Sequence, residues 1–176
     1  MSSKSLIADS FVLYKQRPAR IVEPGEKKIT IQTEGGERLS VRPKDVQLLH
    51  RGPLRSLGEL NRADTGDIMA AWELLAGETT TLQELSELAF EEFTPASAWA
   101  IWQLVEDGLY FRADEPDAID VQSAAEVAAV EAERAAKAAE EAAWAAFAAR
   151  INRNTYLPED EARLTDVVEL ALRDRE

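Results

Sequence analysis

Residues 28–41, with the sequence KITIQTEGGERLSV, contain the pattern that decides the fold of the first part of the chain. Apolar and polar residues alternate over 28–33, and the apolar ones are isoleucines, which is typical of a half-buried strand. Gly35 and Gly36 then predict a tight turn, because glycine readily adopts the positive φ that such a turn requires. With residues 38–41 as the return strand, the stretch predicts an antiparallel hairpin.

Further short strands are predicted on both sides of this hairpin. Apolar residues cluster at 11–14, at 18–22 and at 46–49, with turn-forming residues between the clusters. Closely spaced short strands are characteristic of small, strongly curved sheets. We therefore expect a small β-barrel of SH3-like size over residues 1–50.

A helical region is predicted after a connector over residues 51–62. Asp64 or Thr65 is a suitable N-cap for a first helix, because the side chains of both residue types accept hydrogen bonds from free backbone amides. Gly77 follows the apolar residues of this helix and is expected to end it. The whole helical region is expected to span residues 63–112.

Two more helices have clearer start signals. Thr81 and Glu84 have the spacing of a capping box, and Thr94 with Pro95 is a favourable N-cap followed by a favourable first helical residue. Gly108 is expected to end the third helix before a short aromatic strand. This order predicts a winged-helix (helix-turn-helix) domain, and the alternative is a simple three-helix packing unit.

The last third of the chain is predicted to be mostly helical. Residues 113–120 are expected to be an acidic linker. Residues 121–151 are rich in alanine and contain no glycine or proline, which predicts one long helix. A further helix is expected over residues 158–176, and its apolar pattern continues to the last residues. The predicted fold class is α+β.

The composition removes several classes of function. The chain has 176 residues and no cysteine, which excludes disulfides, thiolate nucleophiles and the common structural zinc sites. His50 is the single histidine, and no nucleophile motif accompanies it. No apolar run reaches the ~20 residues of a membrane helix, and no signal peptide is recognisable. We expect a cytoplasmic protein without a membrane partner, and this segment offers neither catalytic nor metal-ligating residues.

Charge is distributed unevenly along the chain. Residues 1–62 carry 12 Lys and Arg and 7 Asp and Glu, whereas residues 63–176 carry 8 and 26. Residues 1–62 would therefore attract a polyanion, and residues 63–176 would repel it. Phe11 and Tyr14 lie near cations in the sequence, so a base could stack there. The candidate RNA-binding residues are Lys15, Arg17, Arg20, Lys27, Lys28, Arg42 and Lys44.

Duplex DNA is not an expected partner. In winged-helix DNA readers the third helix enters the major groove, but residues 95–107 contain no lysine or arginine and end in Glu106-Asp107. A scaffold or protein-contact role is favoured for this domain.

Four segments together resemble the N-terminal region of ribonuclease II and ribonuclease R family exoribonucleases, of the bacterial and plastid type. They are RPARIV (17–22), VRPKDVQLLHRGP (41–53), DIMAAWELL (67–75) and DGLYF (107–111). The resemblance implies a 3′→5′ exoribonuclease that hydrolyses single-stranded RNA with Mg²⁺ held by aspartates of a separate, RNB-type catalytic domain. None of those aspartates has a counterpart here.

The resemblance implies that this chain is the leading segment of such an enzyme. Its partners would be single-stranded RNA and its own downstream catalytic domain, and it would need no cofactor itself. The alternatives are a winged-helix regulator that acts through protein contacts and an adaptor that self-associates through the alanine-rich helix.

Overall fold

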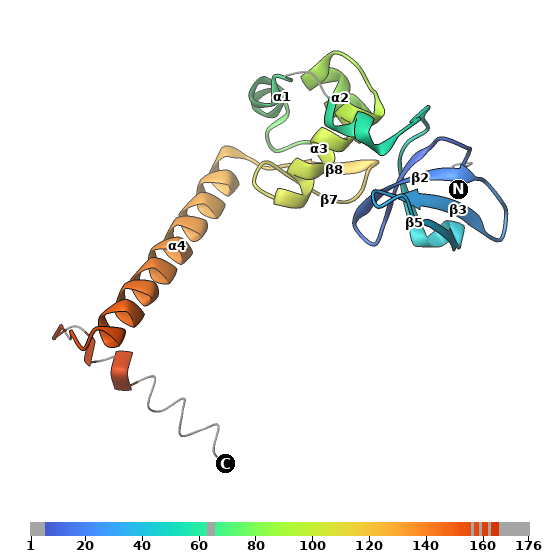
Figure 1. Cartoon of the computed structure of the whole chain (residues 1–176). Helices are drawn as coiled ribbons and strands as arrows, with labels where there is room; N and C mark the ends of the chain where they lie inside the picture. The colour runs from blue at the N-terminus through green and yellow to red at the C-terminus, as the bar shows by residue number, and fades with distance from the viewer. Residues whose placement is uncertain (1–5, 63–65, 156, 159, 162, 166–176) are drawn as a thin grey trace. The chain divides into compact units, whose positions relative to one another are not determined.

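The computed structural model describes residues 6–62, 66–155, 157, 158, 160, 161 and 163–165 (Figure 1). The chain forms two compact units, residues 1–128 and residues 129–176, and each is described by itself. The first unit has a sheet module, residues 6–50, and a helical module, residues 66–121, joined by residues 51–62. The structure is mixed α+β with antiparallel sheets, as the sequence predicts.

The sheet module is one antiparallel sheet with the strand order β4-β3-β2-β1-β5. The predicted central hairpin is confirmed, because β3 and β4 pair with Ile29 opposite Val41 and Ile31 opposite Leu39. A short 3-10 helix, η1 (Pro43–Asp45), leads from β4 into β5. The strands are β1 (Phe11–Tyr14), β2 (Arg17–Glu23), β3 (Ile29–Thr33), β4 (Arg38–Val41) and β5 (Val46–His50).

Strand β1 contributes to two hydrophobic cores. Side chains alternate along a strand, so neighbouring residues point to opposite faces of the sheet. Val12 packs with Ile21 and Ile31 inside the sheet module. Phe11 and Leu13 belong to the other core, which the helical module largely forms. Phe11, Val12 and Leu13 are all buried, so this strand joins the two modules.

The helical module combines three helices with a small antiparallel sheet. The sheet has the strand order β6-β8-β7, and α2 and α3 pack against each other. The elements are α1 (Ile68–Leu75), β6 (Thr79–Thr80), α2 (Leu82–Phe90), α3 (Pro95–Asp107), β7 (Phe111–Glu115) and β8 (Ala118–Val121).

Most of the predicted helix signals are confirmed. The Thr81 hydroxyl accepts from the Glu84 amide and the Glu84 carboxylate accepts from the Thr81 amide, which completes the capping box. Thr94 caps α3, and Gly108 ends it with a φ of 72°. The N-cap of α1 is Asp67, and the predicted caps at residues 64 and 65 lie outside the described residues.

The prediction of an acidic linker over residues 113–120 is wrong. This segment forms most of a β-hairpin, in which β7 and β8 pair antiparallel. Ile119 and Val121 are buried in the core, while Asp120 between them is exposed. The acidic residues therefore lie on the solvent side of a half-buried hairpin. The domain predicted to end at residue 112 extends to Val121.

The connector over residues 51–62 is part of the core. It contains the 3-10 helix η2 (Leu57–Arg62), and Leu54 and Leu60 are buried among residues of the helical module. The Leu54 amide donates to the Asp9 carbonyl (2.8 Å), which fixes the segment to the sheet module.

The predicted long helix is α4 (Ala124–Asn152). It begins three residues later than predicted, because Ser123 and Glu126 cap it: the Ser123 amide donates to Glu126 Oε2 (2.8 Å). Residues 131–142 are exposed all round. Within the described residues, no helix combines the length and the apolar character that a membrane crossing requires.

In the second unit, residues that follow α4 contact the last turns of this helix. Phe147 is buried, and Arg150 Nε donates to Asp160 Oδ2 (2.9 Å). The hydrogen bond from Arg150 lowers the pKa of Asp160 below its usual range. Residues 160, 161 and 163–165 are helical, in line with the start of the predicted last helix, and residues 166–176 lie outside the described residues.

Leu54 tests whether the connector is part of the core. Leu54→Ala should lower the free energy of unfolding by about 2–5 kcal/mol, because it leaves a cavity at a fully buried position. Leu74→Ala, at a 68 % exposed position, is the matched control and should change it by no more than about 0.5 kcal/mol. Equal small effects in chemical denaturation would contradict the connector's place in the core.

Candidate functional site

Three of the seven predicted RNA-binding residues come together at one corner of the sheet module. The β1–β2 pairing places Tyr14 opposite Arg17, and the β1–β5 pairing places Tyr14 opposite Val46. The β1–β2 turn therefore lies beside the end of η1, which carries Lys44. We call Tyr14, Lys15, Arg17 and Lys44 the β1–β2 corner.

The side chains of the corner offer an aromatic ring among cations. Tyr14 is half-buried, and Lys15, Arg17 and Lys44 are exposed. The Lys15 Nζ lies 5.4 Å from the centroid of the Tyr14 ring, in the range of a cation–π contact. These three cations have no ion-pair partner among the described residues.

Two depressions open at this corner. The larger, about 520 Å³, lies between the start of β2 and the β3–β4 turn. Lys15 and Arg17 line it together with Glu34 and Glu37. The smaller, about 210 Å³, is lined by Lys15, Gln16 and Lys44 among others. Lys15 lines both depressions, Arg17 lines the larger and Lys44 the smaller.

The turn between β1 and β2 has a strained backbone. Lys15 has a φ of 50° and Gln16 a φ of 61°, although both carry side chains that make left-handed backbone unfavourable. Two-residue hairpin turns with two positive φ angles usually contain asparagine, aspartate or glycine. Backbone strain of this kind concentrates at functional sites, where surrounding structure holds it in place.

Two of the predicted residues are held by carboxylates. Arg20 Nη1 donates to Asp9 Oδ1 (3.0 Å), and its Nη2 donates to Gln32 Oε1 (2.9 Å). Arg42 Nε donates to Asp45 Oδ2 (2.8 Å), and this pair raises the pKa of Arg42 and lowers that of Asp45. Neither guanidinium is placed to join the corner without breaking these contacts.

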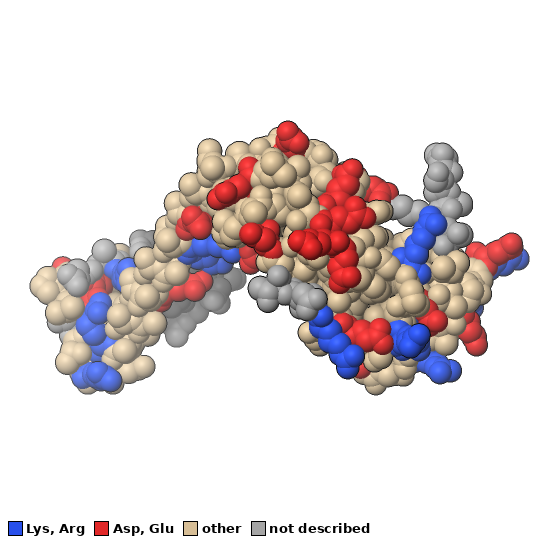
Figure 2. Space-filling model, turned by 90° about the horizontal axis from the view of Figure 1, so that it is seen from above, with Lys and Arg blue, Asp and Glu red and all other residues tan. Residues whose placement is uncertain are grey.

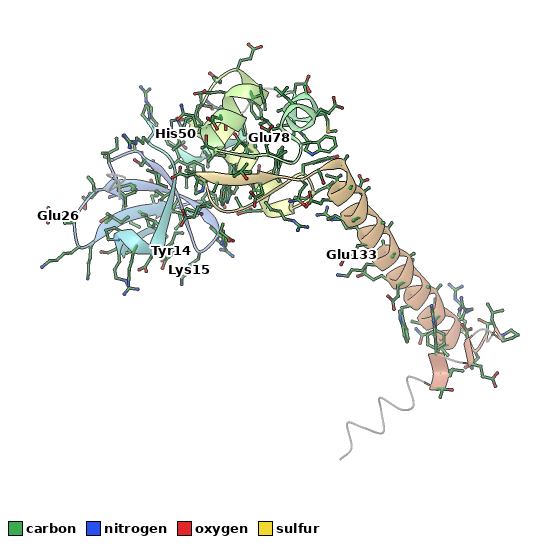
Figure 3. The ribbon with its side chains drawn as sticks, turned by 180° about the vertical axis from the view of Figure 1, so that it is seen from behind. Tyr14, Lys15, Glu26, His50, Glu78 and Glu133 are labelled. Carbon is green, nitrogen blue, oxygen red and sulfur yellow. The ribbon has the colours of Figure 1, made fainter. Side chains whose placement is uncertain are left out.

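Lys27 and Lys28 lie at the other end of the sheet. They belong to the turn between β2 and β3, whereas the corner belongs to the turn between β1 and β2. Figure 3 shows Tyr14 and Lys15 at one end of the strands and Glu26, the neighbour of Lys27, at the other. The seven predicted residues therefore do not form a single surface.

Phe11 is not available for base stacking. It is fully buried and packs edge-on against Trp99, with ring centroids 5.9 Å apart. Of the two aromatic residues that the sequence suggested, only Tyr14 reaches the surface.

The helical module has the opposite charge. Residues 66–111 contain no lysine or arginine. On the face shown in Figure 2, acidic side chains gather over this module, and lysine and arginine side chains appear over the sheet module. A polyanion would therefore be attracted to the sheet module and repelled by the helices.

His50 joins the two modules, a role that its sequence neighbours did not indicate. The Gly52 amide donates to His50 Nδ1 (2.8 Å), so Nδ1 carries no proton, and Nε2 donates to the Phe93 carbonyl (3.2 Å). The ring also packs on Phe93, with centroids 4.4 Å apart. This arrangement needs the neutral imidazole, and burial lowers the pKa of His50 below its usual value.

Among the described residues, no three histidine, aspartate or glutamate side chains converge as metal ligands. Comparisons with protein-family models, with curated proteins and with solved structures found no match to this chain.

The His50 contacts predict a specific pH dependence. A folded-state pKa below 6.5 means that the unfolded chain binds a proton more readily, so stability is lost as the pH falls from 6.5 through the folded pKa. Because His50 is the single histidine, its ring resonances in NMR report this pKa directly.

The titration midpoint should lie below 6.5, and His50→Gln should remove this component of the pH dependence of unfolding. A midpoint at or above 6.5 would contradict the neutral, doubly hydrogen-bonded ring.

Proposed function

We propose that this chain is the RNA-handling front segment of a 3′→5′ exoribonuclease of the ribonuclease II family, and that the β1–β2 corner contacts single-stranded RNA. The observation that carries the proposal is the corner itself, where Lys15 lies over the half-buried ring of Tyr14 and the exposed Arg17 and Lys44 lie on the neighbouring segments. Hydrolysis and magnesium binding would belong to a separate catalytic domain.

The chemistry of the corner suits a single strand. Lysine and arginine neutralise phosphates without regard to sequence, and an aromatic ring stacks on any base. The Lys15 side chain is flexible, so it can move from the ring of Tyr14 to a phosphate when a base takes its place. Glu34 and Glu37 also line the larger depression, and their carboxylates would repel phosphates. The RNA backbone would therefore pass on the side of Lys15 and Lys44.

The order of elements supports an SH3-like barrel for the sheet module and a winged helix for the helical module. In the sheet module, a 3-10 helix precedes the last strand, and that strand pairs with the first. In the helical module, a short strand lies between the first two helices and pairs with β8 of the hairpin that follows α3. Both module types occur widely in proteins that handle nucleic acids, which by itself assigns no function.

The helical module is not suited to duplex DNA. The exposed residues near the end of α3 include Gln103, Glu106 and Asp107, and the β7–β8 hairpin exposes Asp114 and Glu115. Contacts to the phosphates of a duplex need the opposite charge. This favours a role in scaffolding or protein contact for the module.

The segments that carry the resemblance to the enzyme family form strands and helices of both modules of the first unit. VRPKDVQLLHRGP covers η1 and β5, and DIMAAWELL covers α1 and its N-cap. These segments therefore support the order of modules rather than a catalytic site.

A second candidate function is an adaptor that acts only through protein contacts. It is favoured by the exposed Leu74 on the acidic helical module. The two functions differ in whether RNA binds at all.

Paired charge reversals test the RNA site. Lys15→Glu/Arg17→Glu should weaken binding of a uridine oligonucleotide about tenfold or more at low salt. It should also reduce the slope of log affinity against log salt by about 1.4, the value for two lost single-strand phosphate contacts. Fluorescence anisotropy at several salt concentrations measures both.

Lys27→Glu/Lys28→Glu is the matched control, because it changes the net charge equally at the other end of the sheet. It should leave most of the affinity. Equal losses of affinity in the two variants would show that net charge, and not the β1–β2 corner, determines binding. No binding by the wild-type chain at low salt would favour the adaptor function.

Tyr14→Leu tests the stacking contact separately, because leucine keeps the apolar packing of the ring. It should weaken binding by about 1–3 kcal/mol and leave the salt slope unchanged. An unchanged affinity in the same anisotropy measurement would exclude stacking on Tyr14.

A further inference from the structure

Helix α1 is apolar on all sides. Glu73 is the single polar residue in its sequence, IMAAWELL. Its inner side is built into the core: Ala71 is buried, Ile68 and Leu75 pack against the core, and the Trp72 Nε1 donates to the Gln122 carbonyl (2.7 Å). Its outer side is also apolar, which is unusual for a surface helix.

The outer side consists of Met69, Ala70 and Leu74, with Glu73 among them. Met69 is 45 % exposed and Leu74 is 68 % exposed, the highest value among the large apolar residues of the described chain. The helix lies at the edge of the helical module with α2 beside it (Figure 1). A helix that is apolar all round is normally covered on every side, so this surface is suited to a partner.

Three carboxylates lie on this helix or next to its ends. Asp67 caps the start of the helix, and Glu73 is exposed on it. The exposed Glu78, labelled in Figure 3, follows the end of the helix. The helical module has one cation, Arg112 on β7, and none on α1, α2 or α3. A partner that covers the surface must therefore supply both apolar anchors and positive charge.

We propose that the outer face of α1, formed by Met69, Ala70, Glu73 and Leu74, binds a basic amphipathic helix of a protein partner. Apolar residues of the partner, spaced three and four apart, would cover Leu74 and Met69, and its lysines or arginines would face Asp67, Glu73 and Glu78. The flexible thioether chain of Met69 can adjust to apolar side chains of different shape. This surface is distinct from the β1–β2 corner and does not depend on RNA binding.

Charge selects this occupant over two others. In a symmetric dimer through α1, the same patch would face itself, so Glu73 of one copy would approach the acidic face of the other. An anionic lipid surface would be repelled by the same carboxylates. A basic helix is the occupant that satisfies both the apolar and the acidic parts of the surface.

A pair of synthetic peptides tests the proposal with the full chain. The probe is a 14-residue helix-forming peptide with leucine on one face and lysine on the other, and the control peptide has glutamate in place of each lysine. The lysine peptide should bind in isothermal titration calorimetry, and Leu74→Ser should weaken it about tenfold or more. The glutamate peptide should not bind.

Ile7→Ser is the matched variant, because Ile7 is a 47 % exposed apolar residue of the sheet module. It should leave binding of the lysine peptide unchanged. Glu73→Lys keeps the apolar surface and should weaken binding of the lysine peptide and reduce its dependence on salt.

Three results would overturn the proposal. They are an equal loss in the Leu74 and Ile7 variants, binding of the glutamate peptide as tight as that of the lysine peptide, and a dimer in sedimentation equilibrium that Leu74→Ser dissociates. The last result would assign the surface to a second copy of the chain.

Discussion

The first unit depends on strand β1, because its two faces are buried in two different cores. Val12 packs inside the sheet module, while Phe11 and Leu13 pack with the helical module. A one-residue shift of this strand would exchange the two faces and disrupt both cores. The same pairing fixes the turn that follows β1. Tyr14 at the end of β1, Lys15 in the turn and Arg17 at the start of β2 are therefore held at one corner of the sheet.

Because the two modules share a core, a cationic region and an acidic region belong to the same compact unit. Among the described residues, the cations of the β1–β2 corner have no ion-pair partner, whereas Arg20 and Arg42 pair with Asp9 and Asp45. The helical module, residues 66–121, carries 13 aspartates and glutamates and a single cation, Arg112. A single strand of RNA would thus be guided along one part of the unit and kept from the other, which leaves the acidic helices for protein contacts.

Features that depend on near neighbours could be predicted from the sequence. The central hairpin, the capping box at Thr81 and the glycine that ends α3 are confirmed. The β7–β8 hairpin could not be predicted, because the many aspartates and glutamates of this segment are typical of a solvated linker. Its two buried residues, Ile119 and Val121, are too few to give a clear strand pattern. The ion pair between Arg20 and Asp9, and the contact of His50 with Phe93, join residues that are distant in sequence, so no local pattern indicates them.

The central claim is that single-stranded RNA meets the chain at the β1–β2 corner. Backbone amide shifts in NMR, followed during titration with a short uridine oligonucleotide, test it most directly. The account predicts that the shifts concentrate at residues 14–18 and 44–47 and leave residues 66–121 unchanged. Shifts centred on the helical module, or spread evenly over every exposed lysine and arginine of the sheet, would contradict it.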